Sequence, residues 1–195
     1  MWIRVFSRIG MWLLAVPVLA FPQAPEDSKL VQREDSLQTV LPRFLALNEN
    51  IATGAQPAAA AFAKLANRGF RAVLSLRTDT EGVDLKKDRE LTEAAGMRYL
   101  QIPVVTAAPA PERVEEFLKT VADQKNYPLL IYCGSANRVG ALWMIYRVVA
   151  NGWTEEKALA EAVKIGLTRP ELKSFVQSYL ARRAQNNLLP PASPR

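Results

Sequence analysis

Residues 129–144 read LLIYCGSANRVGALWM and combine an apolar run, small residues and a helical pattern. Leu129–Tyr132 is a short apolar run of the kind that forms a fully buried strand, whereas residues 138–150 carry a helical pattern that ends at Asn151-Gly152. Cys133, the only cysteine of the chain, stands between the two, at the start of a run of small residues. A strand, a tight loop and a helix in this order indicate one unit of an α/β sheet.

The same alternation continues on both sides of this stretch. Further strands are expected at residues 50–53, 71–76 and 98–104, and further helices at 57–67, 85–95, 111–122, 155–165 and 170–182. Proline stands at the first position of three of these helices, and Thr154 is expected to cap a fourth. The pattern predicts an α/β fold in which helices flank a mostly parallel central sheet.

Composition narrows the classes of function. The 195 residues are 49% hydrophobic, which is typical of a soluble globular protein, and they carry a formal net charge of +6. The basic residues are scattered, so nucleic acid is not an expected partner. The chain contains no histidine, which excludes a Ser-His-Asp triad, a Cys-His pair and a histidine metal site. With one cysteine there is no thiolate cluster for zinc either, and neither a metal nor another cofactor is expected.

The N-terminus has the layout of a secretory signal peptide. Arg4 and Arg8 precede an uncharged run over residues 9–21, and Val18-Leu19-Ala20 forms a small-residue cleavage pattern. We therefore expect a signal peptide at 1–20, a periplasmic or secreted protein and no stable membrane insertion after cleavage; a retained anchor is the alternative. Residues 21–40 are expected to form a flexible lead-in, 41–182 the folded domain and 183–195 a disordered tail.

The loop after the apolar run has the features of an anion site. Ligands of parallel sheets collect beyond the carboxyl ends of the strands, where Cys133 is placed. Small residues let successive N–H groups turn inward beside a helix N-terminus, and such a field favours the nucleophilic thiolate form of a cysteine. The guanidinium of Arg138 can hold two oxygens of an oxyanion at once. The expected anion-binding residues are Gly134, Ser135, Ala136, Asn137 and Arg138. From these residues alone, an inert buried cysteine and a solvated arginine remain an equal alternative.

Four blocks along the chain carry a resemblance to a known family: Gly54-Ala55-Gln56-Pro57, Leu74-Ser75-Leu76-Arg77, residues 133–140 and Gly152-Trp153. Over residues 41–167 the sequence resembles the bacterial dual-specificity-phosphatase-like domains of the beta-lactamase-hydrolase-like phosphatase family, which belongs to the cysteine-dependent phosphatase superfamily.

The resemblance implies a phosphoric monoester hydrolase. Cys133 would form a phosphocysteine, and the loop backbone and Arg138 would hold the phosphoryl oxygens. Arg77 would support the loop or extend the positive site. The substrate would be a phosphorylated protein, such as one with phosphotyrosine, or a small phosphoester.

The chain departs from the usual pattern of tyrosine and dual-specificity phosphatases. Tyr132 replaces the histidine before the cysteine, four residues instead of five separate Cys133 from Arg138, and Val139 replaces a serine or threonine. The loop after residues 98–104 lacks the general-acid aspartate of those enzymes. The remaining candidates for the acid are Asp79, Glu81, Asp84 and Glu112.

The short loop is also similar to that of rhodanese-like sulfurtransferases. Sulfur transfer through a persulfide on Cys133 requires no general acid, so it remains an alternative. A non-catalytic anion-binding module with the same loop is the third possibility.

Overall fold

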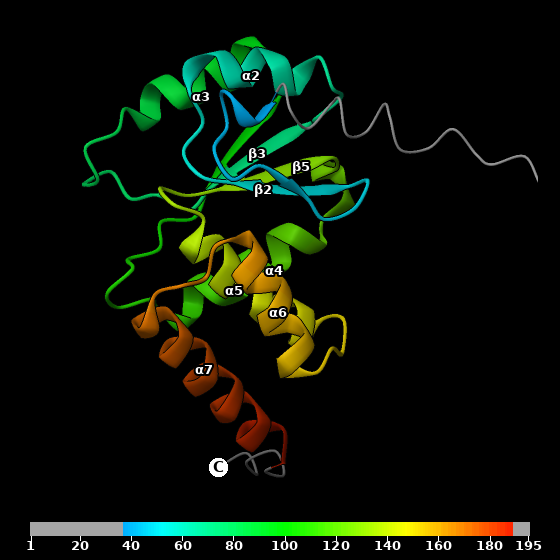
Figure 1. The fold of residues 1–195 in the computed structure, drawn as a ribbon, viewed down its shortest axis with the longest axis vertical. Coiled ribbons are helices and arrows are strands. Elements are labelled where there is room, and N and C mark those ends of the chain that lie inside the picture. Colours follow the sequence, from blue (N-terminus) through cyan, green and yellow to red (C-terminus); the bar gives the residue numbers. More distant parts are fainter. Residues whose placement is uncertain (1–36, 189–195) are drawn as a thin grey trace, which may run out of the picture.

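Five strands form one sheet in residues 37–188, the part of the chain that the computed structural model describes (Figure 1). The strands are β1 (Leu45–Ala46), β2 (Ile51–Gly54), β3 (Ala72–Ser75), β4 (Arg98–Gln101) and β5 (Leu129–Tyr132). Their order is β1-β2-β5-β3-β4, with β1 antiparallel to β2 and all other neighbours parallel. The predicted mostly parallel sheet is therefore confirmed. β1 was not predicted from the sequence, because a strand of two residues is too short to show an alternating hydrophobic pattern.

Helices cover both faces of the sheet. Figure 1 shows α2 and α3 on one face and α4, α5, α6 and α7 on the other. The helices are α2 (Ala59–Ala66), α3 (Leu85–Ala94), α4 (Pro111–Ala122), α5 (Asn137–Val149), α6 (Glu155–Ile165) and α7 (Pro170–Leu188), with a short 3-10 helix η1 (Gln124–Asn126) before β5. The side chain of Thr154 accepts a hydrogen bond from the backbone N–H of Lys157, which confirms the predicted cap of α6.

The central strand β5 divides its side chains between two cores. Leu129 and Ile131 belong to the hydrophobic cluster under α4–α7, whereas Leu130 and Tyr132 belong to the cluster under α2 and α3. This is the two-residue alternation of a strand that is buried on both faces. Cys133 continues the pattern and faces α5, so Tyr132 and Cys133 lie on opposite faces of the sheet.

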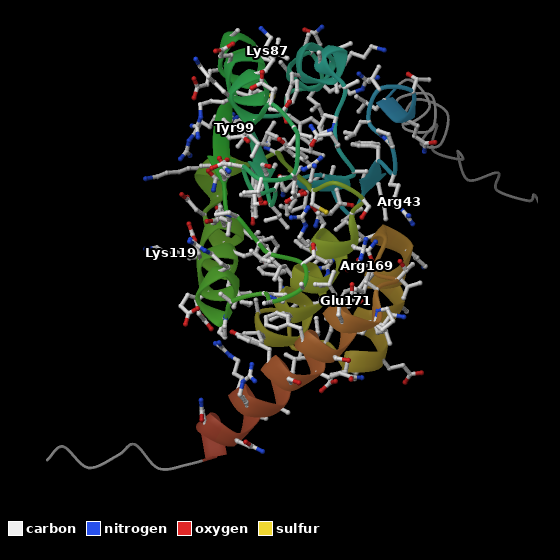
Figure 2. The ribbon with its side chains drawn as sticks, turned by 90° about the vertical axis from the view of Figure 1, so that its left-hand side faces the viewer. Arg43, Lys87, Tyr99, Lys119, Arg169 and Glu171 are labelled. Atoms are coloured by element: carbon white, nitrogen blue, oxygen red, sulfur yellow. The ribbon has the colours of Figure 1, made fainter. Side chains whose placement is uncertain are left out.

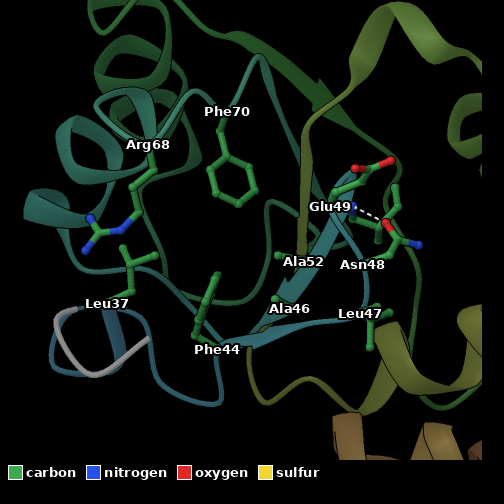
Figure 3. Close-up of a pocket in the computed structure, with 10 residues that line it drawn as sticks. Leu37, Phe44, Ala46, Leu47, Asn48, Glu49, Ala52, Arg68 and Phe70 are labelled. Carbon is green, nitrogen blue, oxygen red and sulfur yellow. Dashed lines mark hydrogen bonds between the residues drawn. The ribbon is translucent and has the colours of Figure 1, made fainter. Parts of the chain in front are cut away.

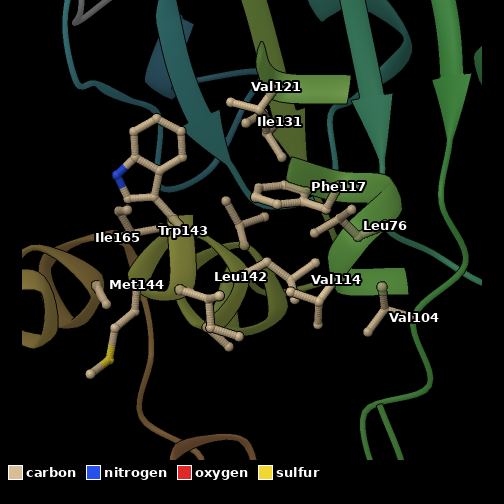
Figure 4. Close-up of a cluster of buried hydrophobic side chains, with 14 of the residues drawn as sticks. Leu76, Val104, Val114, Phe117, Val121, Ile131, Leu142, Trp143, Met144 and Ile165 are labelled. Carbon is tan, nitrogen blue, oxygen red and sulfur yellow. The ribbon is translucent and has the colours of Figure 1, made fainter. Parts of the chain in front are cut away.

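Helix α5 is buried along its first nine residues, Asn137 to Ile145. Figure 4 shows Leu142 and Trp143 of α5 among Phe117 of α4 and Ile165 of α6. A helix enclosed in this way by its neighbours has little freedom to shift. The core therefore holds the N-terminus of α5, where the loop from β5 arrives, in a fixed position.

Gly140 marks the closest approach between α5 and the end of α6. A Cβ at this position would lie 2.7 Å from the carbonyl oxygen of Ala162 and 3.0 Å from the backbone nitrogen of Leu167. Gly140→Ala should therefore lower the free energy of unfolding by about 1–3 kcal/mol, although the same change at an open helical site is stabilising. Chemical denaturation of the two proteins measures the difference. An unchanged or higher stability would contradict the close packing.

Both ends of the folded domain extend beyond the predicted limits of 41 and 182. Leu37, placed in the flexible lead-in by the sequence, is 1% exposed and packs in the cluster under α2 and α3. At the other end α7 continues to Leu188, so the expected tail begins too early. Arg183, the first residue of that tail, donates to a carboxylate oxygen of Glu115 on α4 at 2.6 Å, and this contact anchors the helix.

The remaining parts of the predicted N-terminal organisation lie outside the described residues. These are the signal peptide at 1–20 and the first part of the lead-in, and they stay predictions. Within residues 37–188, none of the helices has the length and apolar character needed to cross a membrane.

Charged side chains lie on the periphery of the molecule. Lys87 on α3, Lys119 on α4 and Arg43 before β1 are exposed on different parts of the fold (Figure 2). Their separation agrees with the scatter of basic residues in the sequence.

Candidate functional site

Cys133 follows the carboxyl end of β5, in the middle of the sheet, and is only 1% exposed. The loop Gly134–Ala136 leads directly into α5, whose first two residues are Asn137 and Arg138. The structure therefore brings the predicted nucleophile and the predicted anion-binding residues together on one loop and one helix N-terminus. Within residues 37–188, no carbonyl or side-chain acceptor takes the backbone N–H groups of Gly134, Ser135 or Ala136.

A left-handed residue gives the loop its shape. Ala136 has φ +63°, a conformation that is uncommon for alanine. Gly166, after α6, supports this turn from outside: a Cβ on it would lie 3.1 Å from the Cβ of Ala136 and 3.2 Å from the carbonyl oxygen of Ser135. The turn between α6 and α7 thus presses against the loop and holds its curvature.

The Asn137 side chain ties the loop to the start of α7. Its Oδ1 accepts hydrogen bonds from the backbone N–H groups of Thr168 at 2.8 Å and Arg169 at 3.0 Å. Its Nδ2 lies 3.3 Å from Oγ of Ser135. Asn137 was predicted to bind the anion. That contact was predicted for the backbone N–H, which lies in the first turn of α5, while the side chain orients the loop.

Arg138 is 5% exposed and holds several parts of the site together. Nη1 donates to the carbonyl oxygens of Leu76 at 3.1 Å and Val104 at 2.8 Å. Nη1 and Nη2 also donate hydrogen bonds to the two carboxylate oxygens of Glu81, at 2.6 and 2.7 Å. The end of the guanidinium fork is therefore occupied by Glu81.

The other edge of the Arg138 guanidinium faces the cysteine loop. Within residues 37–188, no oxygen acceptor takes the Nε–H, and a Cβ on Gly134 would lie 3.7 Å from Nη2. Burial alone would lower the pKa of Arg138, but its hydrogen bonds to Glu81 and Cys133 and the charges of both groups raise it overall. The guanidinium stays charged, and the edge that Glu81 does not take faces Cys133.

Glu81 was predicted only as a candidate general acid, and the structure shows a different role. Burial alone would raise the pKa of Glu81, but hydrogen bonds from Arg138 and the Thr78 backbone, with the charges of Arg138 and Arg77, outweigh it and lower the pKa to about 2. A carboxylate with this pKa holds no proton to donate at neutral pH. Glu81 is therefore a fixed counter-charge that orients Arg138.

Arg77 contributes a second guanidinium beside the loop. It is 8% exposed, and a Cβ on Gly134 would lie 3.7 Å from its Cζ and Nη1. Its Nε donates to Glu81 at 3.1 Å and its Nη1 donates to Oε1 of Gln56 at 2.8 Å. Two guanidinium groups thus share one carboxylate, which leaves an excess of positive charge next to Cys133.

A buried polar network behind the loop fixes Arg77. Oδ2 of Asp88 accepts hydrogen bonds from Gln56 Nε2 at 2.8 Å and from the Tyr132 hydroxyl at 2.9 Å. Because the amide nitrogen of Gln56 donates to Asp88, the amide oxygen of Gln56 points toward Arg77. Tyr132, found where related enzymes have histidine, therefore serves this network on the far face of the sheet.

Lowering the pH should reduce the free energy of unfolding, because Glu81 becomes protonated. Its pKa is depressed in the folded protein, so its contribution is present above the ordinary value of 4.5 and is lost as pH falls from there toward about 2. Because the side chain is one quarter exposed, solvent screening limits the loss to about 2 kcal/mol.

Denaturation of the parent and of Glu81→Gln across this pH range measures the contribution of Glu81. The variant should be less stable at pH 7 and should lose less stability than the parent on acidification. Glu90→Gln, which changes an exposed carboxylate on α3, is the control. Parallel pH curves for the parent and Glu81→Gln would contradict the role of Glu81.

A separate pocket of about 440 Å³ lies at the opposite end of the sheet (Figure 3). Ile51 and Ala52 at the start of β2 line it, together with Phe70 just before β3. Because β2, β3 and β5 are parallel, this end is the one remote from Cys133. Neither here nor elsewhere in residues 37–188 do three histidine, cysteine or acidic side chains gather as metal ligands.

Comparison with known proteins places this arrangement in a family. The family described as "DSP-PTPase phosphatase fused to NAD+ Kinase" matches residues 31–178. The Beta-lactamase hydrolase-like protein of Xylella fastidiosa is 28% identical over 110 residues, which are 55% of this chain. The aligned region is 25% of that protein, so the chain spans about a quarter of this curated relative.

Two solved structures share the fold. A DUF442 protein from Shewanella putrefaciens CN-32 aligns with a TM-score of 0.63 at 19% identity, covering 75% of this chain and 97% of that one. TpbA of P. aeruginosa aligns with a TM-score of 0.60 at 21% identity, covering 75% and 91%.

The family match confirms the resemblance stated from the sequence and favours a phosphatase domain over the rhodanese-like alternative. It includes β1 to β5, the Cys133 loop and Arg138. The chain belongs to the family of DSP-PTPase phosphatases fused to NAD+ kinase.

Proposed function

We propose that this protein hydrolyses phosphomonoesters through a phosphocysteine on Cys133. The observation that carries the proposal is the combination of a buried cysteine, unpaired loop N–H groups and an Arg138 guanidinium edge that faces the cysteine. Such a loop fits the tetrahedral oxygens of a phosphoryl group. In a related structure, a cysteine-to-serine variant of TpbA is in complex with phosphotyrosine, which supports the same type of ligand here.

Binding comes first. The phosphoryl oxygens accept hydrogen bonds from the backbone N–H groups of Gly134–Arg138, and the edge of Arg138 that faces Cys133 donates to two of them. Glu81 holds the other end of Arg138, so this guanidinium does not have to be ordered when the substrate arrives. Arg77 adds a second positive charge beside Gly134.

Two displacements follow. The Cys133 thiolate attacks phosphorus, an S–P bond forms, and the P–O bond to the leaving group breaks. Water then attacks the phosphocysteine, the S–P bond breaks, and the thiolate is restored, with the proton from water carried away on the released phosphate. Arg138 and the loop N–H groups hold the charge that develops on the phosphoryl oxygens in both steps.

Acid quenching during turnover of 4-nitrophenyl phosphate tests this scheme. Intact mass and peptide mapping should show one phosphoryl group on the peptide that carries Cys133 in the parent protein. The Cys133→Ala variant supplies the blank. Turnover by the parent with no cysteine-linked phosphate under any quench time, together with equal turnover by the variant, would refute the mechanism.

We also propose that the protein is exported to the periplasm or secreted. The support is the sequence pattern at the N-terminus, with Arg4 and Arg8 before an uncharged run over residues 9–21 and a small-residue cleavage pattern that ends at Ala20. N-terminal sequencing of the protein recovered from cell fractions should find a start after Ala20 or Ala24 outside the cytoplasm. Recovery from the cytoplasm with Met1 intact would refute export.

A further inference from the structure

The first displacement leaves negative charge on the oxygen that departs from phosphorus. An alkyl alkoxide is strongly basic and needs a proton from a nearby acid as it leaves. A phenolate is far more stable, because a phenol such as the tyrosine side chain has a pKa of about 10. The acids around the loop therefore decide which phosphate esters can react, provided the proposed phosphatase function holds.

The segment after β4 offers no acid. Residues 102–110 read IPVVTAAPA, with Thr106 as the only polar side chain. Val104 is 1% exposed and its carbonyl oxygen accepts from Arg138, so this segment does pass beside the site. The next carboxyl group is that of Glu112, which is exposed in the first turn of α4. A carboxylate at that position stabilises the helix N-terminus.

The segment after β3 holds three carboxyl groups, and each has another partner. Glu81 is gripped by Arg138 and Arg77, and its Oε1 also accepts from the backbone N–H and the hydroxyl of Thr78, at 2.8 and 3.1 Å. Asp84 caps α3 by accepting from the Lys87 N–H at 2.8 Å. Glu81 thus faces the site as a paired anion and not as a proton donor.

The third of these groups, Asp79, has its partner on β4. Its Oδ1 lies 3.2 Å from Nε2 of Gln101 at the end of β4. The same Nε2 also donates to the carbonyl oxygen of Arg77 at 3.3 Å, so Asp79 is engaged on the β3–β4 side of the sheet. Asp88 is buried on the opposite face of the sheet, bound by Tyr132 and Gln56, and Glu171 in the first turn of α7 is paired with Arg169 at 3.1 Å.

We infer that this protein acts on aryl phosphates, whose leaving oxygen departs as a phenolate without a proton from any side chain, and does not act on alkyl phosphates. In the reacting complex the S–P bond forms as the aryl P–O bond breaks. The electron pair stays on the phenolate oxygen, which takes its proton from water after release. The loop and Arg138 hold the phosphoryl group in the same way for both classes of ester, so the selectivity arises from the leaving group.

The test is the dependence of kcat/KM on the acidity of the leaving phenol. The full chain is assayed under reducing conditions with a series from 4-nitrophenyl phosphate to phenyl phosphate, and with phosphoserine as the alkyl ester. We expect phenyl phosphate to react roughly 10²-fold more slowly than 4-nitrophenyl phosphate, because proton donation by a general acid contributes about 10²–10⁴-fold where it is present. Phosphoserine turnover should not exceed that of Cys133→Ser.

Variants separate the possible outcomes. Asp79→Asn and Glu112→Gln should leave the steep dependence unchanged. A flat dependence in the parent that becomes steep in either variant would identify that residue as the acid and overturn the inference, while leaving the phosphatase function intact. Turnover of phosphoserine at a rate close to that of the aryl esters would overturn it as well. Absence of cysteine-dependent turnover with every aryl ester would instead refute the proposed function itself.

Discussion

Replacing Cys133 with serine is expected to lower kcat for 4-nitrophenyl phosphate by at least about 10³-fold. A serine hydroxyl is a weak nucleophile unless a base takes its proton, and the chain contains no histidine to act as that base. Glu81 cannot replace it, because both of its oxygens already accept hydrogen bonds from arginine. Initial rates under reducing conditions measure the loss.

The loss in Cys133→Ser should be chemical and not structural. The sulfur is 1% exposed, so a buried hydroxyl in its place costs at most about 1–3 kcal/mol of stability. Binding of inorganic phosphate, measured by calorimetry, should persist because the loop N–H groups and Arg138 are unchanged. Turnover within tenfold of the parent would show that Cys133 is not the nucleophile.

Arg138→Lys should reduce kcat/KM by roughly 10²–10³-fold. A lysine ammonium has no planar fork, so it cannot hold Glu81 and two phosphoryl oxygens at the same time. The change also removes the Arg138 donor from the carbonyl oxygen of Val104, which should lower the free energy of unfolding by about 1–3 kcal/mol. Steady-state kinetics and denaturation measure the two effects separately.

The same substitution at Arg147 provides a matched control. Arg147 lies on the same helix, donates to both carboxylate oxygens of Glu161 at 2.7 and 2.9 Å, and stacks on Trp143 and Trp153. Arg147→Lys should therefore also cost stability, but kcat/KM should stay within about twofold because the pair lies outside the loop. Equal activity losses in the two variants would show that Arg138 acts only through stability.

The local features of this fold could be predicted from the sequence because each has a local cause. The apolar run Leu129–Tyr132 and the small residues after it determine a buried strand and a tight turn, whatever the rest of the chain does. Pro111 at the start of α4 and Thr154 before α6 mark helix boundaries in the same way. These signals were sufficient to place Cys133 at the carboxyl edge of a parallel sheet.

The contacts that orient the site could not be predicted, because they join distant segments. Glu81 and Arg138 are 57 residues apart, and nothing in either local sequence indicates that their side chains meet. Asp88 and Tyr132 are 44 residues apart and pack on the face opposite the cysteine. Gln56 was noted only as part of a block that carries the family resemblance, while its contact with Arg77 depends on the order of β2, β5 and β3 in the sheet.

The hydrogen bonds of Asn137 allow the state of the cysteine loop to be monitored at backbone amides outside the loop. The backbone N–H groups of Thr168 and Arg169 both donate to its Oδ1, although they lie 31 and 32 residues further along the chain. Their exchange with deuterated solvent is therefore controlled by the position of a loop side chain and not by a regular helix. Two amides outside the loop can thus report, without labelling or altering Cys133, when the loop opens and how firmly a bound anion holds it closed.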